Sequence, residues 1–533
     1  MKELLNKIPK RIYIALSGLL LGLTIAFAEI GILAYVALIP MALVILKKFE
    51  GEDYKSKSAY LDGFIFYMCF DIVAFHWVAY FYPLDFAGLN NFQSLIVVAL
   101  GWIGLSLLQS TFSAFVFLIL SRIAKTELCR KYKLLIAPLA AALFAINELT
   151  QTFTWAGVPW ARIAISQTAM PCLMQSASLF GSYFLTFLVV VINFLIAYAI
   201  LNVEKRRLAA YIALSVFGFN ALFGAVALAL PTPEQKSIKV ASVQGNFESQ
   251  SNLSSIDEML ARYKRLITEA AENGAELIVL PEGTFPLDIR YMVKDTNGSY
   301  RTLDKIFSNL AVELGVTITV GSYYNTEETS HSSMSTFYGD GTKILNSYAK
   351  RRPVPFGEFL PMKDLIEAII PLLAEINIFS NLTPGERSTL FGATSDENAI
   401  KVGTLLCFDS IYETLGIDCA REGAEMIIIP SNDSWFYDSR ALNMHHSQNI
   451  LRAVEQRKYV VNSGNTGLTS IVNEKGEVVE TMPIYTDGYV ISTVYASSGR
   501  TIYSYIGNLF VYLCIAFVLI PVAYSIYRKK IMK

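Results

Sequence analysis

The sequence is poor in charge for its length of 533 residues. Only 17% of the residues are Asp, Glu, Lys or Arg, whereas about 25% is usual for soluble globular proteins, and 53% are hydrophobic. The chain is therefore too apolar to be soluble throughout. It also lacks an excess of either sign, with 44 basic and 45 acidic residues, and this balance excludes a strongly basic nucleic-acid-binding protein.

Cysteine and histidine are scarce as well, with six and four residues. Their spacing contains no pattern typical of a metal site, so we expect neither a metal nor a cofactor. The neutral total hides an uneven distribution of charge. Residues 1–230 carry 17 basic and 11 acidic residues, whereas residues 231–526 carry 23 and 34. This difference indicates a membrane part and a separate, acidic soluble part.

Long apolar runs account for the missing charge. A membrane-spanning helix needs about 20 mostly apolar residues. We expect a polytopic α-helical membrane domain of seven spans at residues 1–230, and an eighth span with a basic cytoplasmic tail at residues 504–533. The eight runs lie at about 12–28, 30–47, 60–82, 93–121, 134–150, 170–202, 208–230 and 504–527.

The positions of Lys and Arg predict the orientation, because short cytoplasmic loops are enriched in both. Outside the soluble part, 20 of 21 basic residues fall on the side of the two termini, and only Arg162 falls on the other. Both termini are thus predicted to be cytoplasmic, with residues 231–503 across the membrane. The first run ends at Ala26-Phe27-Ala28, which resembles a signal-peptide cleavage site. We interpret it as a retained span, because a second apolar run follows almost at once.

Residues 231–503 alternate between strand-like and helix-like segments, a pattern typical of an α/β layered domain. Catalytic residues tend to lie at strand ends in such sheets. The expected strands are at about 239–244, 275–280, 317–320, 335–350, 400–407, 425–430, 467–482 and 488–494, and the expected helices are near 253–272, 302–314 and 441–458.

Three polar residues, Glu282, Lys350 and Cys407, lie at the ends of predicted strands. A thiol reacts as the thiolate and needs a base and a nearby positive charge. A carboxylate supplies the base, and an ammonium stabilises the oxyanion of an acyl-transfer intermediate. The three residues together therefore indicate nucleophilic acyl chemistry.

Each of the three also has a simpler interpretation. Cys407 could be a small buried hydrophobe, or could pair with Cys419 in an oxidising compartment. Glu282 could cap a helix, and Lys350 could lie on the surface. A Cys–His pair that uses His445 or His446 is a further alternative, although no motif supports it.

The order of these motifs resembles the nitrilase (carbon–nitrogen hydrolase) superfamily, and nearly the whole chain resembles its apolipoprotein N-acyltransferase family. The resemblance rests on Pro281-Glu282, on Tyr348-x-Lys350 with Val354-Pro355-Phe356-Gly357-Glu358 after it, and on Cys407 followed by an aromatic residue and an acid. Further stretches that resemble the family are Phe27–Ala28, Gly63–Trp77, Trp155–Trp160, Gln175–Asn193, Gln244–Asn246, Thr383–Gly385 and Arg452–Glu455.

The resemblance implies a nitrilase-like αββα sandwich with a Glu-Lys-Cys catalytic set. Glu282 would be the general base, Lys350 the oxyanion stabiliser and Cys407 the nucleophile. Glu358 would be a second essential acid, and the backbone N–H of Phe408 would contribute to the oxyanion hole.

The sequence departs from the family pattern at two places. Phe408 and Asp409 stand where many members have Tyr and Glu, so a phenol hydroxyl is absent and the acid is one methylene shorter. Many members also have a Trp shortly after Gln-Gly-Asn, where this chain offers only Phe247. The second departure leaves the contacts with lipid open.

The family reaction transfers a fatty acyl group from a phospholipid to the α-amino group of the lipidated N-terminal cysteine of a diacylated lipoprotein, which is the last step of lipoprotein maturation. By resemblance it would take place on the periplasmic side of a bacterial inner membrane and proceed by a ping-pong route through a thioester on Cys407. Both substrates are anchored in the bilayer. An enzyme held there meets them without exposing their chains, at about 0.8 kcal/mol per methylene.

Two features are candidates for contact with the membrane. Residues 364–380 are apolar but too interrupted to span, and they predict either an amphipathic arm that dips into the membrane or covers the site, or a helix packed on the sandwich. Trp155 and Trp160 lie where an interfacial aromatic belt is expected, and they either anchor the protein or line an access route for lipid.

Two other functions compete with this interpretation. A membrane-tethered amidase or nitrilase would use the same three residues, with water in place of the amine, but a small soluble substrate gives no reason for eight spans. A transporter or receptor would need charged residues along a path through the spans, for which Asp62 and Asp71 are the main candidates.

Overall fold

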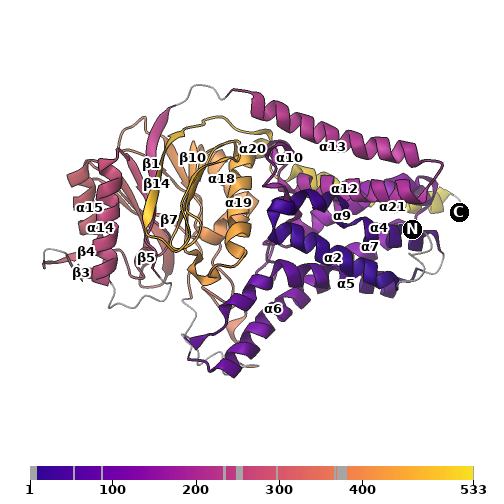
Figure 1. Ribbon diagram of the computed structural model, residues 1–533, viewed down its shortest axis with the longest axis horizontal. Helices are drawn as coiled ribbons and strands as arrows, with labels where there is room; N and C mark the ends of the chain where they lie inside the picture. Colours follow the sequence, from indigo (N-terminus) through magenta and orange to yellow (C-terminus); the bar gives the residue numbers. More distant parts are fainter. Residues whose placement is uncertain are drawn as a thin grey trace. The chain divides into compact units, whose positions relative to one another are not determined.

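The computed structural model describes residues 9–51, 54–85, 88–231, 236–247, 256–295, 298–364, 368 and 381–531. The chain forms two compact units (Figure 1). One consists of Met1–Tyr82, Leu95–Pro231 and Ile506–Lys533, and the other of Pro83–Ser94 and Thr232–Tyr505. The first unit is helical, and the second contains the strands.

Among the described residues, six helical segments of the first unit are long and apolar enough to cross a membrane. The prediction of several membrane helices is confirmed, but this number falls short of the predicted eight. Two other helices of this unit are not among the six. Helix α2 (Lys10–Ala26) is only 17 residues long, and α5 (Ser56–Ala74) contains the charged residues Asp62 and Asp71. The six segments are Ala28–Glu50, Asn91–Ile123, Lys133–Thr150, Ser182–Leu201, Arg206–Ala229 and Leu509–Arg528.

The apolar run at 170–202 is not one helix, as predicted, but three. Short helices α10 (Pro171–Met174) and α11 (Ala177–Phe180) precede α12 (Ser182–Leu201). Gly181 separates α11 from α12 with φ of 78° and ψ of 178°, a backbone conformation that L side chains rarely adopt and that ends a helix. Only α12 is therefore long enough to span.

Buried polar side chains connect the helices of the first unit. Asn193 of α12 accepts a hydrogen bond from the Leu38 N–H (2.9 Å) and donates one to the Ala34 carbonyl (2.8 Å). These two backbone groups lie where α3 (Ala34–Ala37) gives way to α4 (Ile39–Glu50). The amide side chain thus satisfies polar groups that a break in a helix exposes in an apolar environment.

The second unit is built on two six-stranded sheets. The first has the order β14-β1-β2-β5-β6-β7, and β1, β2 and β5 are parallel. Its strands are β14 (Gly488–Tyr495), β1 (Ser237–Gln244), β2 (Leu277–Val279), β5 (Thr317–Asn325), β6 (Ser330–Phe337) and β7 (Lys343–Ala349).

The second sheet has the order β13-β12-β11-β10-β9-β8, with β9, β10 and β11 parallel. A small hairpin of β3 (Met292–Lys294) and β4 (Tyr300–Thr302) lies apart from both sheets. The strands of the second sheet are β13 (Val478–Thr481), β12 (Ser470–Val472), β11 (Val460–Gly464), β10 (Met426–Ser431), β9 (Lys401–Thr404) and β8 (Leu390–Gly392).

The two sheets pack face to face between two layers of helices. One apolar core joins residues of both sheets, such as Val240, Val279, Val402 and Ile428. Helices α14 (Ile256–Glu272) and α15 (Leu303–Leu314) cover the outer face of the first sheet, with their apolar sides in a second core. Helices α18 (Glu413–Glu422) and α19 (Ala441–Gln456) cover the second sheet (Figure 1). The predicted αββα sandwich is confirmed.

Candidate active site

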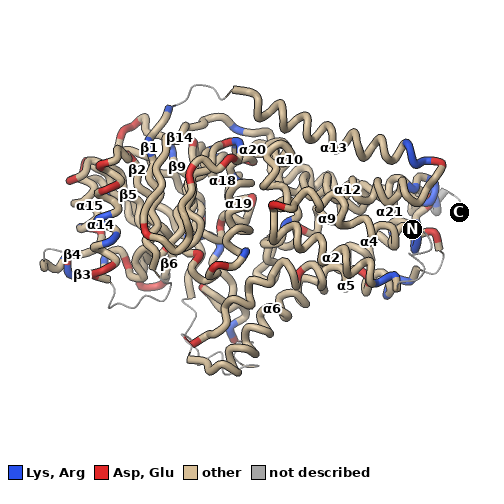
Figure 2. The backbone as a smooth tube through the Cα atoms, in the orientation of Figure 1, with Lys and Arg blue, Asp and Glu red and all other residues tan. Residues whose placement is uncertain are grey.

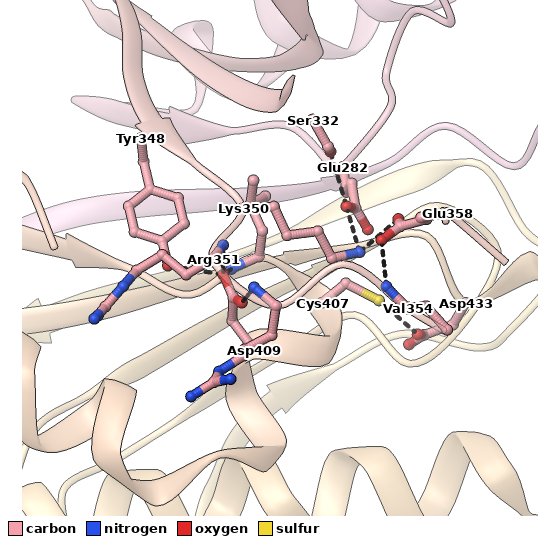
Figure 3. A network of polar contacts seen from close by, with 12 residues as sticks. Glu282, Ser332, Tyr348, Lys350, Arg351, Val354, Glu358, Cys407, Asp409 and Asp433 are labelled. Atoms are coloured by element: carbon pink, nitrogen blue, oxygen red, sulfur yellow. Dashed lines mark hydrogen bonds and ion pairs between the residues drawn. The ribbon is translucent and has the colours of Figure 1, made fainter. Parts of the chain in front are cut away.

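The structure brings the three predicted residues of the site together at one edge of the sandwich (Figure 3). Lys350 directly follows β7, and its Nζ donates a 3.0 Å hydrogen bond to Oε1 of Glu282, which lies three residues beyond the end of β2. Ser332 Oγ donates to the same oxygen at 3.0 Å. Lys350 is 2% exposed and therefore not a surface residue. Glu282, 6% exposed, lies in a turn between β2 and β3 where no helix begins, so it is not a helix cap.

Glu358 is the second acid at the Lys350 ammonium, at 2.7 Å from Nζ to Oε1. Its other oxygen, Oε2, accepts a 2.8 Å hydrogen bond from the Val354 N–H. The chain after Lys350 thus turns back so that Glu358 reaches the ammonium from the same segment. Lys350 is shared between two carboxylates, and its position is fixed by both.

The charges at this cluster depend on burial and pairing. Burial disfavours the charged form of Lys350, but the nearby carboxylates of Glu282 and Glu358 outweigh it and hold the Lys350 pKa well above its usual range. Burial raises the pKa of Glu358, and the Lys350 ammonium opposes that rise. The ammonium therefore stays charged and can stabilise a developing oxyanion.

Cys407 opens a short 3-10 helix, η7 (Cys407–Ile411), rather than ending a strand, because β9 already ends at Thr404. Its backbone φ is +47°, an uncommon conformation for a residue other than glycine. The sulfur points to the side where the Lys350 ammonium lies (Figure 3). Burial raises the pKa of the thiol well above its usual value, Glu282 adds to the rise, and Lys350 opposes it. The resting side chain is therefore a neutral thiol that needs a base.

Asp409, two residues after Cys407, joins the turn that carries the nucleophile to the segment that carries Lys350. Its Oδ2 accepts hydrogen bonds from the Tyr348 hydroxyl (2.7 Å) and the Arg351 N–H (3.2 Å), and its Oδ1 accepts one from the Arg352 N–H (2.7 Å). Burial raises the pKa of Asp409. Phe408 packs its ring edge-on against Tyr412, with 5.7 Å between the centroids.

Sequence reasoning missed Asp433, which opens η8 (Asp433–Phe436) just after β10. Its Oδ1 accepts a hydrogen bond from His445 Nδ1 (3.0 Å) and lies 3.9 Å from the Cys407 sulfur. The signal was present, because Asp433 follows an apolar strand just as Glu282 does. His445 Nε2 lies 3.2 Å from the Cys407 carbonyl oxygen, so His445 contacts the backbone of Cys407, whereas His446 bonds to Ser470 at 2.8 Å.

The other residues singled out in the sequence, a second cysteine and three aromatic residues, have their own surroundings. Cys419 is a free thiol, as are all six cysteines, and its sulfur lies 3.7 Å from the Thr404 carbonyl oxygen, so no disulfide joins it to Cys407. Phe247 is buried beneath the Arg262 guanidinium, 4.2 Å from its ring centroid. Trp160 is buried against Trp77 (5.1 Å between centroids), whereas Trp155 is half-buried.

A role of Trp155, Trp160 or Phe247 in lipid access stays a prediction. Apart from Asp364 and Ala368, the predicted arm at residues 364–380 lies outside the described residues.

Comparison with known proteins covers both units. The sequence model of the carbon–nitrogen hydrolases matches residues 239–503, and that of the apolipoprotein N-acyltransferase N-terminal domain matches residues 17–195. The chain is 28% identical to the apolipoprotein N-acyltransferase of Geobacter metallireducens over 99% of this chain and 97% of that one. It is 26% identical to that of Thermotoga maritima over 96% and 92%.

Among solved structures, a nitrilase-superfamily protein of Saccharomyces cerevisiae is 20% identical and covers 52% of this chain and 96% of its own, with a TM-score of 0.36. The two sequence models match different parts of the chain, and the relatives match nearly its whole length. The chain therefore belongs to the apolipoprotein N-acyltransferase family of acyltransferases, and its second unit is a carbon–nitrogen hydrolase domain.

Proposed function

We propose that the protein transfers a fatty acyl group from a phospholipid to the α-amino group of the lipidated N-terminal cysteine of a diacylated lipoprotein, as the last step of lipoprotein maturation. One observation carries the proposal. A buried thiol, a carboxylate and an ammonium meet in a hydrolase domain whose chain also contains helices long enough to cross a membrane. Relatives that match nearly the whole chain are named for this activity.

The proposed reaction has two half-reactions. In the first, the Cys407 sulfur attacks the ester carbonyl carbon of the phospholipid while Glu282 takes the thiol proton. Lys350 and the N–H of Phe408, in the first turn of η7, stabilise the oxyanion. The C–O bond then breaks, the proton on Glu282 passes to the leaving lysophospholipid, and a thioester remains on Cys407.

In the second half-reaction, the lipoprotein amine attacks the thioester carbon. A C–N bond forms, the C–S bond breaks, and the sulfur regains a proton through Glu282. The raised pKa of the Cys407 thiol favours this proposal. A neutral thiol needs a base to remove its proton before it attacks. A buried thiolate is costly, so the departing sulfur needs a proton as the C–S bond breaks.

The proposed orientation places both termini in the cytoplasm and residues 231–503 on the periplasmic side of the inner membrane. Figure 2 shows Lys and Arg gathered at the ends of the first unit's helices that lie near both chain termini. Short cytoplasmic loops are enriched in these residues. Phospholipid and lipoprotein, the two proposed partners, would then meet the site from the bilayer.

The acidic residues of the spans do not favour a transporter. Asp62 is buried and contacts Arg11, Lys48 and Tyr54. Asp71 accepts a 2.9 Å hydrogen bond from Ser110. Both carboxylates thus connect neighbouring helices, which is typical of structural pairs.

Mass spectrometry of the purified protein after incubation with phospholipid tests the proposal. We expect one acyl group on Cys407, removed when a diacylated lipopeptide is added and recovered as an amide on its N-terminus. Cys407→Ala should abolish both signals, whereas the matched variant Cys419→Ala, which removes another buried thiol of the same unit, should retain them. Unimpaired N-acylation by Cys407→Ala would refute the mechanism. Turnover of a small amide but not of the lipopeptide would favour an amidase.

A further inference from the structure

Asp433 is a buried carboxylate beside the nucleophile that the proposed acyl chemistry does not use. Its side chain is 3% exposed, and its Oδ1 lies 3.9 Å from the Cys407 sulfur. In Figure 3, the sulfur lies between the Lys350 ammonium and the Asp433 carboxylate. Glu282 and Asp433 thus approach the sulfur from different strand ends, after β2 and β10.

The surroundings hold Asp433 in place. His445 Nδ1 bonds to Oδ1 at 3.0 Å, while His445 Nε2 lies 3.0 Å from Ser410 Oγ and 3.2 Å from the Cys407 carbonyl oxygen. A Cβ at Gly467 would lie only 2.8 Å from the Asp433 Cβ and 3.1 Å from its Oδ2. The chain therefore needs a glycine at 467 for Asp433 to occupy this position. The carboxylate is fixed by the hydrogen bond from His445 and by close packing against Gly467.

One oxygen of Asp433 remains available. Oδ1 interacts with both His445 and the thiol, whereas Oδ2 accepts no hydrogen bond from the part of the chain that the structure describes. A carboxylate oxygen that has no partner among the described residues, on the residue beside the nucleophile, can accept a hydrogen bond from a substrate.

The charges around the sulfur favour a cationic substrate group. Three carboxyl groups (Glu282, Glu358 and Asp433) surround the thiol, with two basic side chains, Lys350 and His445. Lys350 is already shared by the two glutamates. With all five groups ionised, one negative charge is in excess, and a protonated amine would neutralise it.

We propose that Asp433 binds the protonated amine of the acyl acceptor beside the thioester, so that an amine rather than water attacks. This inference rests on the proposed function and specifies how the same site recognises its second substrate. An amine nitrogen in position to attack a thioester on the Cys407 sulfur comes within hydrogen-bond reach of a carboxylate 3.9 Å from that sulfur.

The protons of the step balance. An ammonium and the thioester give an amide, the Cys407 thiol and one released proton. The ammonium first loses that proton to Asp433, which passes it to solvent, and the freed lone pair forms the C–N bond as the C–S bond breaks. The nitrogen's second proton reaches the sulfur through Glu282.

A zinc-type site is a weaker interpretation of the same cluster. One ligand atom each of Cys407, Asp433 and His445 lies within 4.8 Å of the others. Both nitrogens of His445 are already engaged, one by Asp433 and the other by the Cys407 carbonyl oxygen and Ser410. The ring would have to give up one of these bonds to ligate a metal.

Single-turnover kinetics of Asp433→Asn separate the two half-reactions. The variant keeps an oxygen where Oδ1 accepts hydrogen bonds but loses the charge. We expect the thioester on Cys407 to form at the wild-type rate, and transfer to a diacylated lipopeptide to fall by about a hundredfold or more. Hydroxylamine, which is largely uncharged at neutral pH, should discharge the thioester at the wild-type rate. Asp438→Asn, an exposed aspartate near Asp433 in the sequence, is the matched control and should behave as wild type.

Two outcomes would overturn the inference. Equal slowing with lipopeptide and hydroxylamine would make Asp433 a structural residue, and unchanged transfer to the lipopeptide would remove it from acceptor binding. Failure of the wild-type protein to form any thioester would instead overturn the proposed function itself, so the two failures are distinguishable.

Discussion

Tyr348 and Asp409 lie 61 residues apart in the sequence, yet the Tyr348 hydroxyl donates a 2.7 Å hydrogen bond to Oδ2 of Asp409. Both side chains are buried. Tyr348 stands two residues before Lys350 and Asp409 two residues after Cys407, so this bond connects the strand end that carries the ammonium to the turn that carries the nucleophile. Asp409, the acid that is one methylene shorter than in many family members, therefore connects these two segments of the site.

The first prediction concerns this connection. Asp409→Ala removes the acceptor of the Tyr348 hydroxyl and of three backbone N–H groups, those of Arg351, Arg352 and Leu406, and unsatisfied buried donors of this kind cost about 1–3 kcal/mol each. We expect a lower unfolding temperature and slower formation of the thioester, because the strand end that carries Lys350 and the turn that carries Cys407 lose this connection. Asp418→Ala is the control, since Asp418 pairs with Arg351 but is 39% exposed. Equal effects of the two variants would contradict this role of Asp409.

The second prediction follows from the thiol at position 407. Its pKa is raised well above the usual value, chiefly by burial, so only a small fraction is thiolate at neutral pH. We expect slow alkylation by iodoacetamide at pH 7, with a rate that still rises above pH 9. Lys350→Met should slow it further, because the ammonium is the group that lowers this pKa. Peptide mass spectrometry in a Cys419→Ala background measures the rate, and a plateau below pH 8 would contradict the raised pKa.

The third prediction concerns acid sensitivity. Burial, and then the charge of His445, lower the pKa of His446 to about 4, whereas an unfolded histidine titrates near 6.5. The unfolded chain therefore binds more protons between these values, and this contribution to stability is complete above about pH 6.5 and is lost as the pH falls towards 4. His446→Gln should reduce the drop in unfolding temperature between pH 7 and pH 4.5. An equal drop in wild type and His446→Gln would be the contrary result.

The fourth prediction tests the helical unit. Asn193→Leu leaves the Leu38 N–H and the Ala34 carbonyl without their side-chain partner in an apolar interior. Each lost bond to a buried group costs about 1–3 kcal/mol, so we expect a lower unfolding temperature in detergent. Asn202→Leu, at the half-buried end of α12, should have little effect. Comparable unfolding temperatures for the two variants would show that the two backbone groups find other partners.

Much of the architecture could be predicted because it depends on local patterns. Apolar runs revealed the membrane helices, since length and hydropathy are properties of a single segment. Alternating strand and helix periods predicted an α/β layered domain, the resemblance to the nitrilase superfamily implied the sandwich, and the apolar strands led to Glu282, Lys350 and Cys407. The errors were local in origin too: Gly181 interrupts a run that hydropathy alone treats as continuous, and β9 ends three residues before Cys407.

The sequence by itself determined the apolar body, the acidic soluble part and which residues stand at strand ends, because each depends on neighbours along the chain. Only the tertiary structure decided that Glu358 shares Lys350 with Glu282, that Asp409 bonds to Tyr348, and that Asp433 lies beside the thiol. The charge that each of these groups carries depends on burial and on partners distant in sequence. Folding alone sets those two quantities, because it brings separate strand ends to one edge of the sandwich.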